Sequence, residues 1–275
     1  MNRLPGNEAK SFIRRLLFQE PMRFLLPMIF LCAPPVALAE VITLRADSWC
    51  PYNCDPESDR PGILIEIAKE ILGPAGHSID YRLMPWSRTL NEVLKGNISG
   101  AVGVIPSEAP ELIYGANPLA YDKPGFAFNK GMEFSYRGPS SLDPFRIAVI
   151  RDYHYDDGEI DAYLQAHQTD STRIQPNAGD NAGMANLKKL LSHRVDLVLD
   201  SHDVLAHLVH RHHLGQKVEL YAIDRWTGIH IGFSPVKPES RNLANLLSSG
   251  IPSLRRQGRL AEIFARYGLS DRQEP

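Results

Sequence analysis

The sequence predicts an α/β protein made of two lobes that share one plan. Two separate segments, 90–107 (LNEVLKGNISGAVGVIPS) and 187–201 (LKKLLSHRVDLVLDS), both read as an amphipathic helix, a tight polar turn and an apolar strand. Continuous apolar runs of this kind are typical of parallel strands buried on both faces. Strands that alternate with helices predict a parallel sheet covered by helices. The 275 residues, 43% of them hydrophobic, can build the core of one large domain or of two smaller ones.

The first half of the chain predicts the order strand, helix, strand, helix, strand. Strands are expected at 41–44, 78–84 and 101–105, and helices at 63–71 and from Ser87 to Gly96. The first helix has its apolar residues at helical spacing and stops at Gly73-Pro74. Ser87 is expected to cap the second helix, which Gly96 ends.

The second half predicts a similar unit and then C-terminal helices. Strands are expected at 146–150 and 195–200, and helices at 158–167, 184–191 and 254–267. No low-complexity linker separates the two halves. The connections between the lobes are therefore expected to be extended strands that act as hinges.

The N-terminal 39 residues have the pattern of a secretory signal peptide. Arg14, Arg15 and Arg23 precede the apolar run 24–39, which ends in the small-residue sequence Ala37-Leu38-Ala39. This pattern predicts export, with cleavage before Glu40. A buried core helix is the alternative, but three prolines in the run disfavour it. Met22 is an alternative start site, because it would begin a more compact signal.

The charge balance excludes several classes of protein. The full chain has 30 basic and 32 acidic side chains, so it carries no overall basic charge for nucleic acid. Its longest apolar run is shorter than the roughly 18 to 20 residues of a membrane-spanning helix. Removal of the predicted signal peptide takes away five basic and two acidic residues. The remaining chain has 25 basic and 30 acidic side chains and a net charge of −5. The sequence thus predicts an exported, soluble protein that binds no nucleic acid.

Cys50 and Cys54 are the two cysteines that remain after cleavage. Two thiols four positions apart in an exported protein are expected to form a local disulfide. A C-x-x-x-C metal or redox site is the alternative, but other close ligands are missing.

Several segments, taken in order, resemble a known family. They are Trp49-Cys50-Pro51-Tyr52, GILIEIAKEILGPAG, the PWSR turn, SGAVGVIPSEAPELIYGANPL, RVDLVLD and IPSLRRQGRLAEIFARYG. Together they are similar to the family 3 extracellular solute-binding proteins, the periplasmic receptors of polar amino acid ABC importers. The resemblance implies a type II periplasmic binding fold, in which two α/β lobes joined by crossing hinge strands close on a ligand. It implies a first lobe at 40–125 and 226–275 and a second lobe at 126–225.

The same resemblance suggests ligand-binding residues. Members of the family place an aromatic residue in the first loop, where Trp49 and Tyr52 stand in this chain. Asp200 matches the acid that meets the ligand ammonium group, although it could also cap the next helix. The arginine that usually clamps the ligand carboxylate falls at Ala109, so this chain lacks it at that place. Arg88 in PWSR could supply a guanidinium from another direction, or could be a solvated helix residue.

Three further residues are candidates because of their position. Trp86 and Ser107 follow predicted strands, at the edge where ligands bind in open α/β sheets, although Trp86 could equally be core. Tyr153 lies just before a predicted helix in the second lobe, where the family reaches ligand carboxylates with backbone amides. Asp156 and Asp157 would cap that helix instead, which makes an anionic ligand group there less favoured.

A run of histidines at 202–213 raises the question of a metal site. His207 and His210 with Asp203 could bind zinc from one helix face. A solvated face is the stronger interpretation, because Arg211 would repel a cation. We therefore expect neither a metal nor a cofactor.

The expected function is that of a periplasmic solute-binding protein. It would capture a small polar solute, an amino acid or a related compound, for an inner-membrane ABC permease, and would work as a monomer. The sequence shows no nucleophile elbow, phosphate-binding loop or clustered metal ligands, so an enzyme is not expected. A sensory or accessory binding protein and a periplasmic enzyme on the same fold are the alternatives.

Overall fold

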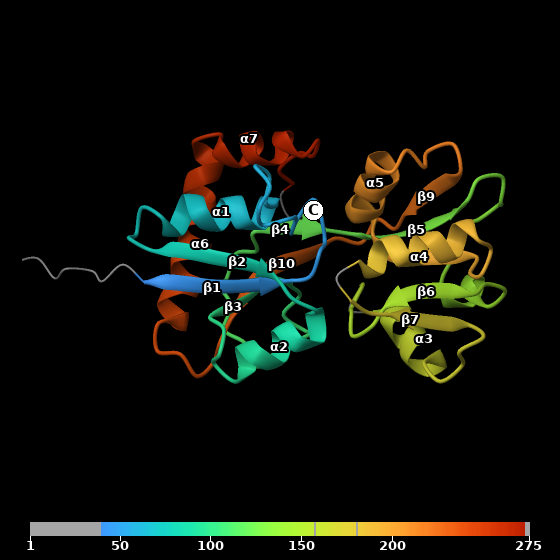
Figure 1. Cartoon of the computed structure of the whole chain (residues 1–275), viewed down its shortest axis with the longest axis horizontal. Helices are drawn as coiled ribbons and strands as arrows, with labels where there is room; N and C mark the ends of the chain where they lie inside the picture. The colour runs from blue at the N-terminus through green and yellow to red at the C-terminus, as the bar shows by residue number, and fades with distance from the viewer. Residues whose placement is uncertain (1–39, 157, 180, 273–275) are drawn as a thin grey trace, which may run out of the picture. The chain divides into compact units, whose positions relative to one another are not determined.

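Two five-stranded mixed sheets, each covered by helices, make up the structure (Figure 1). The computed structural model describes residues 40–156, 158–179 and 181–272, so the predicted signal segment lies outside the described residues. The elements are β1 (Val41–Ala46), α1 (Ile63–Leu72), β2 (Ser78–Leu83), α2 (Trp86–Leu94), β3 (Gly100–Val104), β4 (Ala120–Asp122), β5 (Pro124–Asn129), the 3₁₀ helix η2 (Pro139–Leu142), β6 (Ile147–Ile150), α3 (Glu159–His167), β7 (Ile174–Asn177), α4 (Ala182–Leu191), β8 (Leu197–Ser201), α5 (His202–Arg211), β9 (Val218–Ala222), β10 (Thr227–Phe233), α6 (Ser240–Arg256) and α7 (Arg259–Arg266).

The first sheet has the strand order β2-β1-β3-β10-β4. β1 runs parallel to β2 and β3, whereas β10 pairs antiparallel with both β3 and β4. Helices α1, α6 and α7 pack against one another and bury one face of this sheet, and α2 covers the other face. β10 thus brings a late segment of the chain into a sheet built mainly from the first half.

The second sheet, in the order β7-β6-β8-β5-β9, repeats this plan. β6 runs parallel to β7 and β8, and β5 pairs antiparallel with β8 and β9. Apolar residues of α3 bury one face, and those of α4 and α5 bury the other. The predicted α/β class and two-lobe plan are confirmed. The sheets are connected where β4 passes through Lys123 into β5 and where β9 leads into β10.

The predicted strands and helices lie within one or two residues of the observed ones at most ends, but the C-terminal helices begin earlier than predicted, because α6 starts at Ser240. Two other details are also wrong. Ser87 does not cap α2: it lies inside the helix, whose N-cap is Pro85, and its hydroxyl contacts Asp152. Asp203 is not on a solvated face, because only 5% of it is exposed and it accepts a hydrogen bond from Tyr52. No helix among the described residues combines the length and the apolar character needed to cross a bilayer.

Candidate functional site

A cavity lies where the strand ends of the two sheets face each other. Parallel strands leave their carboxyl ends at one edge of a sheet, and this is where ligands bind in open α/β folds. The residues just after β1 and β3 supply one side of the cavity, and those at the end of β8 and just after β6 supply the other. The lining consists of Asp47, Trp49, Asn53, Trp86, Val102, Gly103, Ile105, Glu108, Asp122, Pro124, Tyr153, His154, Tyr155, Asp200, Ser201 and Thr227.

Four of the residues that the sequence singled out meet in this cavity: Trp49, Trp86, Tyr153 and Asp200. The other three are placed differently. Tyr52 is fully buried behind the lining, Ser107 lines a neighbouring cavity with Arg151 and Asp152, and Arg88 is exposed on α2. The ligand contacts proposed for all seven residues stay predictions.

Trp49 joins the two sides of the cavity. It lies in the loop after β1, and its indole Nε1 donates a 3.1 Å hydrogen bond to Asp200 Oδ1 at the end of β8. Behind it the ring of Tyr52 lies 4.8 Å away, centroid to centroid. The Tyr52 hydroxyl is 3.1 Å from Asp203 Oδ2 and 3.2 Å from Asp122 Oδ1, so the first loop reaches both the connection between the sheets and α5.

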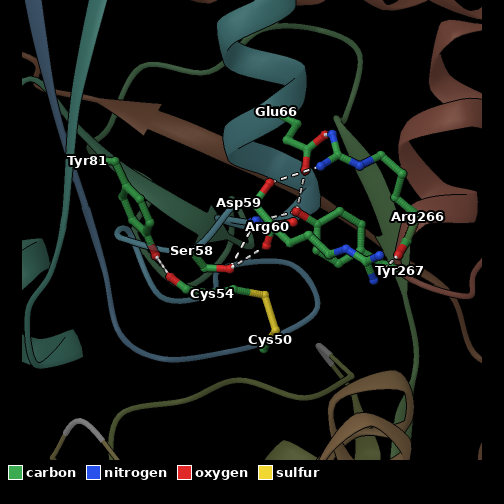
Figure 2. Close-up of a disulfide and its surroundings, with 10 residues drawn as sticks. Cys50, Cys54, Ser58, Asp59, Arg60, Glu66, Tyr81, Arg266 and Tyr267 are labelled. Atoms are coloured by element: carbon green, nitrogen blue, oxygen red, sulfur yellow. Dashed lines mark hydrogen bonds and ion pairs between the residues drawn. A yellow bond between two sulfur atoms is a disulfide. The ribbon is translucent and has the colours of Figure 1, made fainter.

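The same loop is held in place by covalent and polar contacts (Figure 2). Cys50 and Cys54 form the predicted disulfide, with a Cα–Cα distance of 4.5 Å. The Tyr81 hydroxyl donates to the carbonyl of Cys54 at 2.9 Å. At the far end of the loop, Tyr267 donates to Glu66 and accepts from the amide of Gly62. These contacts fix the backbone that carries the Trp49 side chain into the cavity.

Tyr153 crosses the cavity in the opposite direction. Its hydroxyl donates to Asp47 Oδ2, and its ring meets that of Trp86 edge-on at 6.1 Å. Trp86 donates in turn from Nε1 to Glu108 Oε1 at 2.7 Å. Trp49, Trp86 and Tyr153 thus each donate to a carboxyl group.

Glycine is required at Gly103, on the floor of the cavity. Its φ is +89°, and a Cβ would lie 2.8 Å from the side-chain nitrogen of Asn53 and 3.5 Å from the Trp49 ring. The Asn53 nitrogen donates to the carbonyl of Val102 at 3.1 Å. The missing side chain lets the first loop pack directly on β3.

Burial raises the pKa of three carboxyl groups in the cavity. The pKa of Asp47 rises to about 7, that of Asp122 to about 8 and that of Asp200 to about 6. Burial is the largest cause in each case, and the charge of Asp200 adds to the rise at Asp47 and Asp122. Burial also raises the pKa of Glu108. Water is excluded here, and a carboxylate without a counter-charge is therefore unstable.

The space between these side chains is narrow. It measures about 510 Å³ including its opening to solvent, and the Trp49–Asp200 and Tyr153–Asp47 hydrogen bonds cross it. A solute of several heavy atoms therefore requires the contacts of Trp49 and Tyr153 across the cavity to open.

Sequence reasoning missed the acids Asp47, Glu108 and Asp122 and the amide Asn53. Asp47 directly follows β1, and Glu108 follows β3 by four residues. The strand-end rule that pointed to Trp86 and Ser107 could have found both acids. Asp122 and Asn53 carried no such signal, because the short strand β4 and the first loop are placed only by tertiary contacts.

The described residues give no support to a metal centre. In 40–156, 158–179 and 181–272, no group of three or more His, Cys, Asp or Glu side chains is arranged to hold a metal ion. Asp203 accepts hydrogen bonds from Tyr52 and Arg272, so its carboxylate does not form a group with His207 and His210. Burial and the nearby Arg211 lower the pKa of His207, which keeps this side chain neutral.

No protein-family model and no curated protein sequence matches this chain. Solved structures do match it. A structure described with glutathione import in Gram-positive bacteria via GshT and the cystine ABC importer TcyBC of Streptococcus mutans has a TM-score of 0.72. It is 13% identical over 86% of this chain and 98% of its own. This chain has the two-lobe fold of periplasmic binding proteins.

Two other matches show how varied proteins with this fold are. A histidine kinase sensor domain similar to periplasmic binding proteins has a TM-score of 0.67 and 18% identity, over 84% of this chain and 98% of its own. The ancestral amino acid-binding protein AncCDT-1, a precursor of cyclohexadienyl dehydratase, has a TM-score of 0.62 and 12% identity, over 82% and 94%. At such identities the periplasmic-binding fold is shared, and the ligand has to be argued from the cavity itself.

Proposed function

We propose that this protein is a periplasmic solute-binding protein that captures a small polar solute between two lobes. The observation that carries the proposal is the cavity itself, because residues from both sheets line it and meet across it. The Trp49–Asp200 and Tyr153–Asp47 contacts each join one side to the other. A solute that replaced these contacts would hold the lobes together.

In this proposal the signal peptide is 1–39, and the first lobe comprises 40–125 and 226–275. The second lobe comprises 126–225, and the protein acts as a monomer. The distribution of strands supports this division, since β5 to β9 build the second sheet and β10 returns to the first. The bound solute is then delivered to an inner-membrane ABC permease.

A thermal-shift screen of the protein from Glu40 onward tests the proposal. The library contains amino acids, amines and polyamines, organic acids and neutral osmolytes. A ligand at 100 times its Kd should stabilise the folded state by about 2.7 kcal/mol, which raises Tm by several degrees. A folded sample whose Tm is unchanged by every compound would contradict the proposal.

Sensing is the second candidate, because the fold is shared with a histidine kinase sensor domain. Both roles require the same cavity, so they differ in the membrane partner. Crosslinking of the ligand-loaded protein in membranes from its own cells, followed by identification of the partner, separates them. A permease subunit supports transport, whereas a sensor kinase supports signalling. Conversion of a bound compound into a product would instead favour an enzyme.

A further inference from the structure

The charge of the cavity limits what it can bind. An inference about the ligand's charge rests on the proposed function and concerns the same site. Four carboxylic acids line the cavity, namely Asp47, Glu108, Asp122 and Asp200. Among the lining residues none is a lysine or an arginine, and the basic side chain present is His154, 4.0 Å from Glu108. A ligand therefore meets several acids and no fixed positive charge.

Two buried acceptors add to this imbalance. Within the described part of the chain, Asp200 Oδ2 and Asn53 Oδ1 are buried and accept no hydrogen bond. Asp200 is 1% exposed and Asn53 is 1% exposed, and both residues line the cavity. Buried polar atoms normally have partners, so unpaired acceptors on two residues that line the cavity indicate that a ligand supplies donors.

Three aromatic donors of the cavity wall, in contrast, are already engaged. Trp49 donates to Asp200, Trp86 to Glu108 and Tyr153 to Asp47. What these aromatic residues can offer a ligand is their ring faces. Ring faces beside carboxylates attract organic cations, through the cation–π interaction and through charge.

An anionic group finds little support beside the cavity. The amides at the start of α3 are occupied by Asp156, which accepts from Gly158 at 2.9 Å and from Ile160 and Asp161 at 3.3 Å. Arg225 pairs with this same carboxylate. The alanine at position 109 supplies no guanidinium.

The basic side chains at the connections between the sheets are also engaged. Lys123 pairs with Asp224, and Arg272 pairs with Asp203. Both cations lie over the ring of Trp226, at 4.5 Å and 4.3 Å. Within this cavity a ligand carboxylate would thus be buried among acids, because Lys188 and Arg211 line a neighbouring cavity that shares Asp200 with it. Such burial is strongly unfavourable.

We propose that the cavity selects a small organic cation that carries N–H groups, an amine or a guanidine, and that binding needs no carboxylate on the ligand. The cationic group lies against Asp47 and Asp200, at the face of Trp49 or Trp86. Ligand N–H groups take the places that the Trp49 and Tyr153 donors occupy in the closed cavity.

Matched ligand pairs that differ by one carboxylate test this directly. Isothermal titration compares arginine with agmatine and lysine with 1,5-diaminopentane, and includes tetramethylammonium, glutamate and succinate. We expect the decarboxylated member of at least one pair to bind at least about tenfold more tightly than its parent, because the parent buries an unpaired carboxylate. Tighter binding of an amino acid or a dicarboxylate would overturn the cation proposal but leave solute binding intact. No binding by any of these compounds, or by the wider screen, would overturn both.

Charge-removing variants locate the interaction. Asp47→Asn and Asp200→Asn keep the size of each side chain, and each should weaken binding of the best cation about tenfold or more. Glu219→Gln, on an exposed position of β9, removes the same charge away from the cavity and should change affinity less than about twofold. Circular dichroism and Tm establish that each variant is folded. Equal affinity of both cavity variants and the wild type would overturn the proposal.

Discussion

Asp47 is the first residue after β1, and 6% of its surface is exposed. Asp47 shares one cavity with two other buried carboxyl groups, those of Asp122 and Asp200. Their pKa values are about 7 for Asp47, about 8 for Asp122 and about 6 for Asp200. Near neutral pH they are partly protonated, so a cation that binds them releases protons. Affinity for such a ligand should therefore rise as the pH rises from about 6 to about 8.

The stability of the unliganded protein should depend on pH in the opposite direction. The folded chain keeps protons on Asp47, Asp122 and Asp200 that the unfolded chain loses near the ordinary value of 3.8. The unfolded state then binds fewer protons, so these groups lower the free energy of unfolding as pH rises from about 4 to about 8. Asp47→Asn removes one of them and should make this fall less steep.

Urea unfolding at several pH values between 5 and 8, for wild type and Asp47→Asn, measures the two slopes. Glu219→Gln is the charge-matched control, and its slope should follow that of the wild type. If Asp47→Asn kept the wild-type slope, the protonation of Asp47 in the folded state would be refuted.

At the scale of elements, the loop between β1 and α1 positions the site. It carries Trp49 and Tyr52, and its shape depends on the disulfide and on contacts with α7. Arg266, at the end of α7, pairs with Glu66 at 2.7 Å and donates to the carbonyl of Asp59 at 2.9 Å (Figure 2). The C-terminal helix therefore supports a loop more than 200 residues earlier in the chain.

The variant C50S/C54S should loosen this loop. Closing so short a loop contributes about 2 kcal/mol through the entropy of the unfolded chain, so the free energy of unfolding should fall by about this amount. Ligand affinity should fall as well, because Trp49 must then be ordered on binding. Denaturant titration and calorimetry measure the two effects.

Reduced wild-type protein is the control for this experiment, and it should match the double serine variant. An unchanged denaturation midpoint and an unchanged affinity in the variant would show that α7 and β3 hold the loop without the disulfide.

At the scale of the whole described chain, Asp203 contacts segments that are far apart in the sequence. It comes from α5 and contacts Tyr52 of the first loop, His202 and Arg272 of the C-terminal segment. Burial alone would raise the pKa of Asp203, but the hydrogen bond from His202 and the charge of Arg272 lower it. This carboxylate stays ionised, unlike those in the cavity, because a cation accompanies it.

Asp203→Ala should cost about 1–3 kcal/mol of stability, because it leaves the buried Tyr52 hydroxyl with fewer partners and Arg272 with no counter-charge. Arg272→Ala should cost less than about 1 kcal/mol, since its side chain is 34% exposed and the lost charge is partly screened. Denaturant unfolding of both single variants and the double variant measures the coupling. Equal costs for the two single variants would contradict the central role of Asp203.

Local sequence determined much of this fold. Apolar runs predicted the strands β1, β3, β6 and β8, and apolar residues at helical spacing predicted the helices α1 and α4. Both patterns depend only on residues that are near neighbours in the chain. The pairing of Cys50 with Cys54 was predictable from their short spacing together with the predicted export. Trp86 was singled out because it follows a predicted strand, whereas the family resemblance pointed to Trp49, Tyr153 and Asp200; all four line the cavity.

Tertiary structure decided the rest. Strands β4, β5, β9 and β10 are paired by contacts far apart in sequence, and β4 has three residues, too few for a periodic pattern. The acids Asp47, Glu108, Asp122 and Asp200 converge only because β10 returns to the first sheet and β5 opens the second. The sequence by itself determined most of the helices, the main strands, the disulfide and the plan of two lobes. Only the tertiary structure determined that four carboxyl groups share one cavity without a lysine or arginine, because that convergence depends on sheet topology and long-range packing.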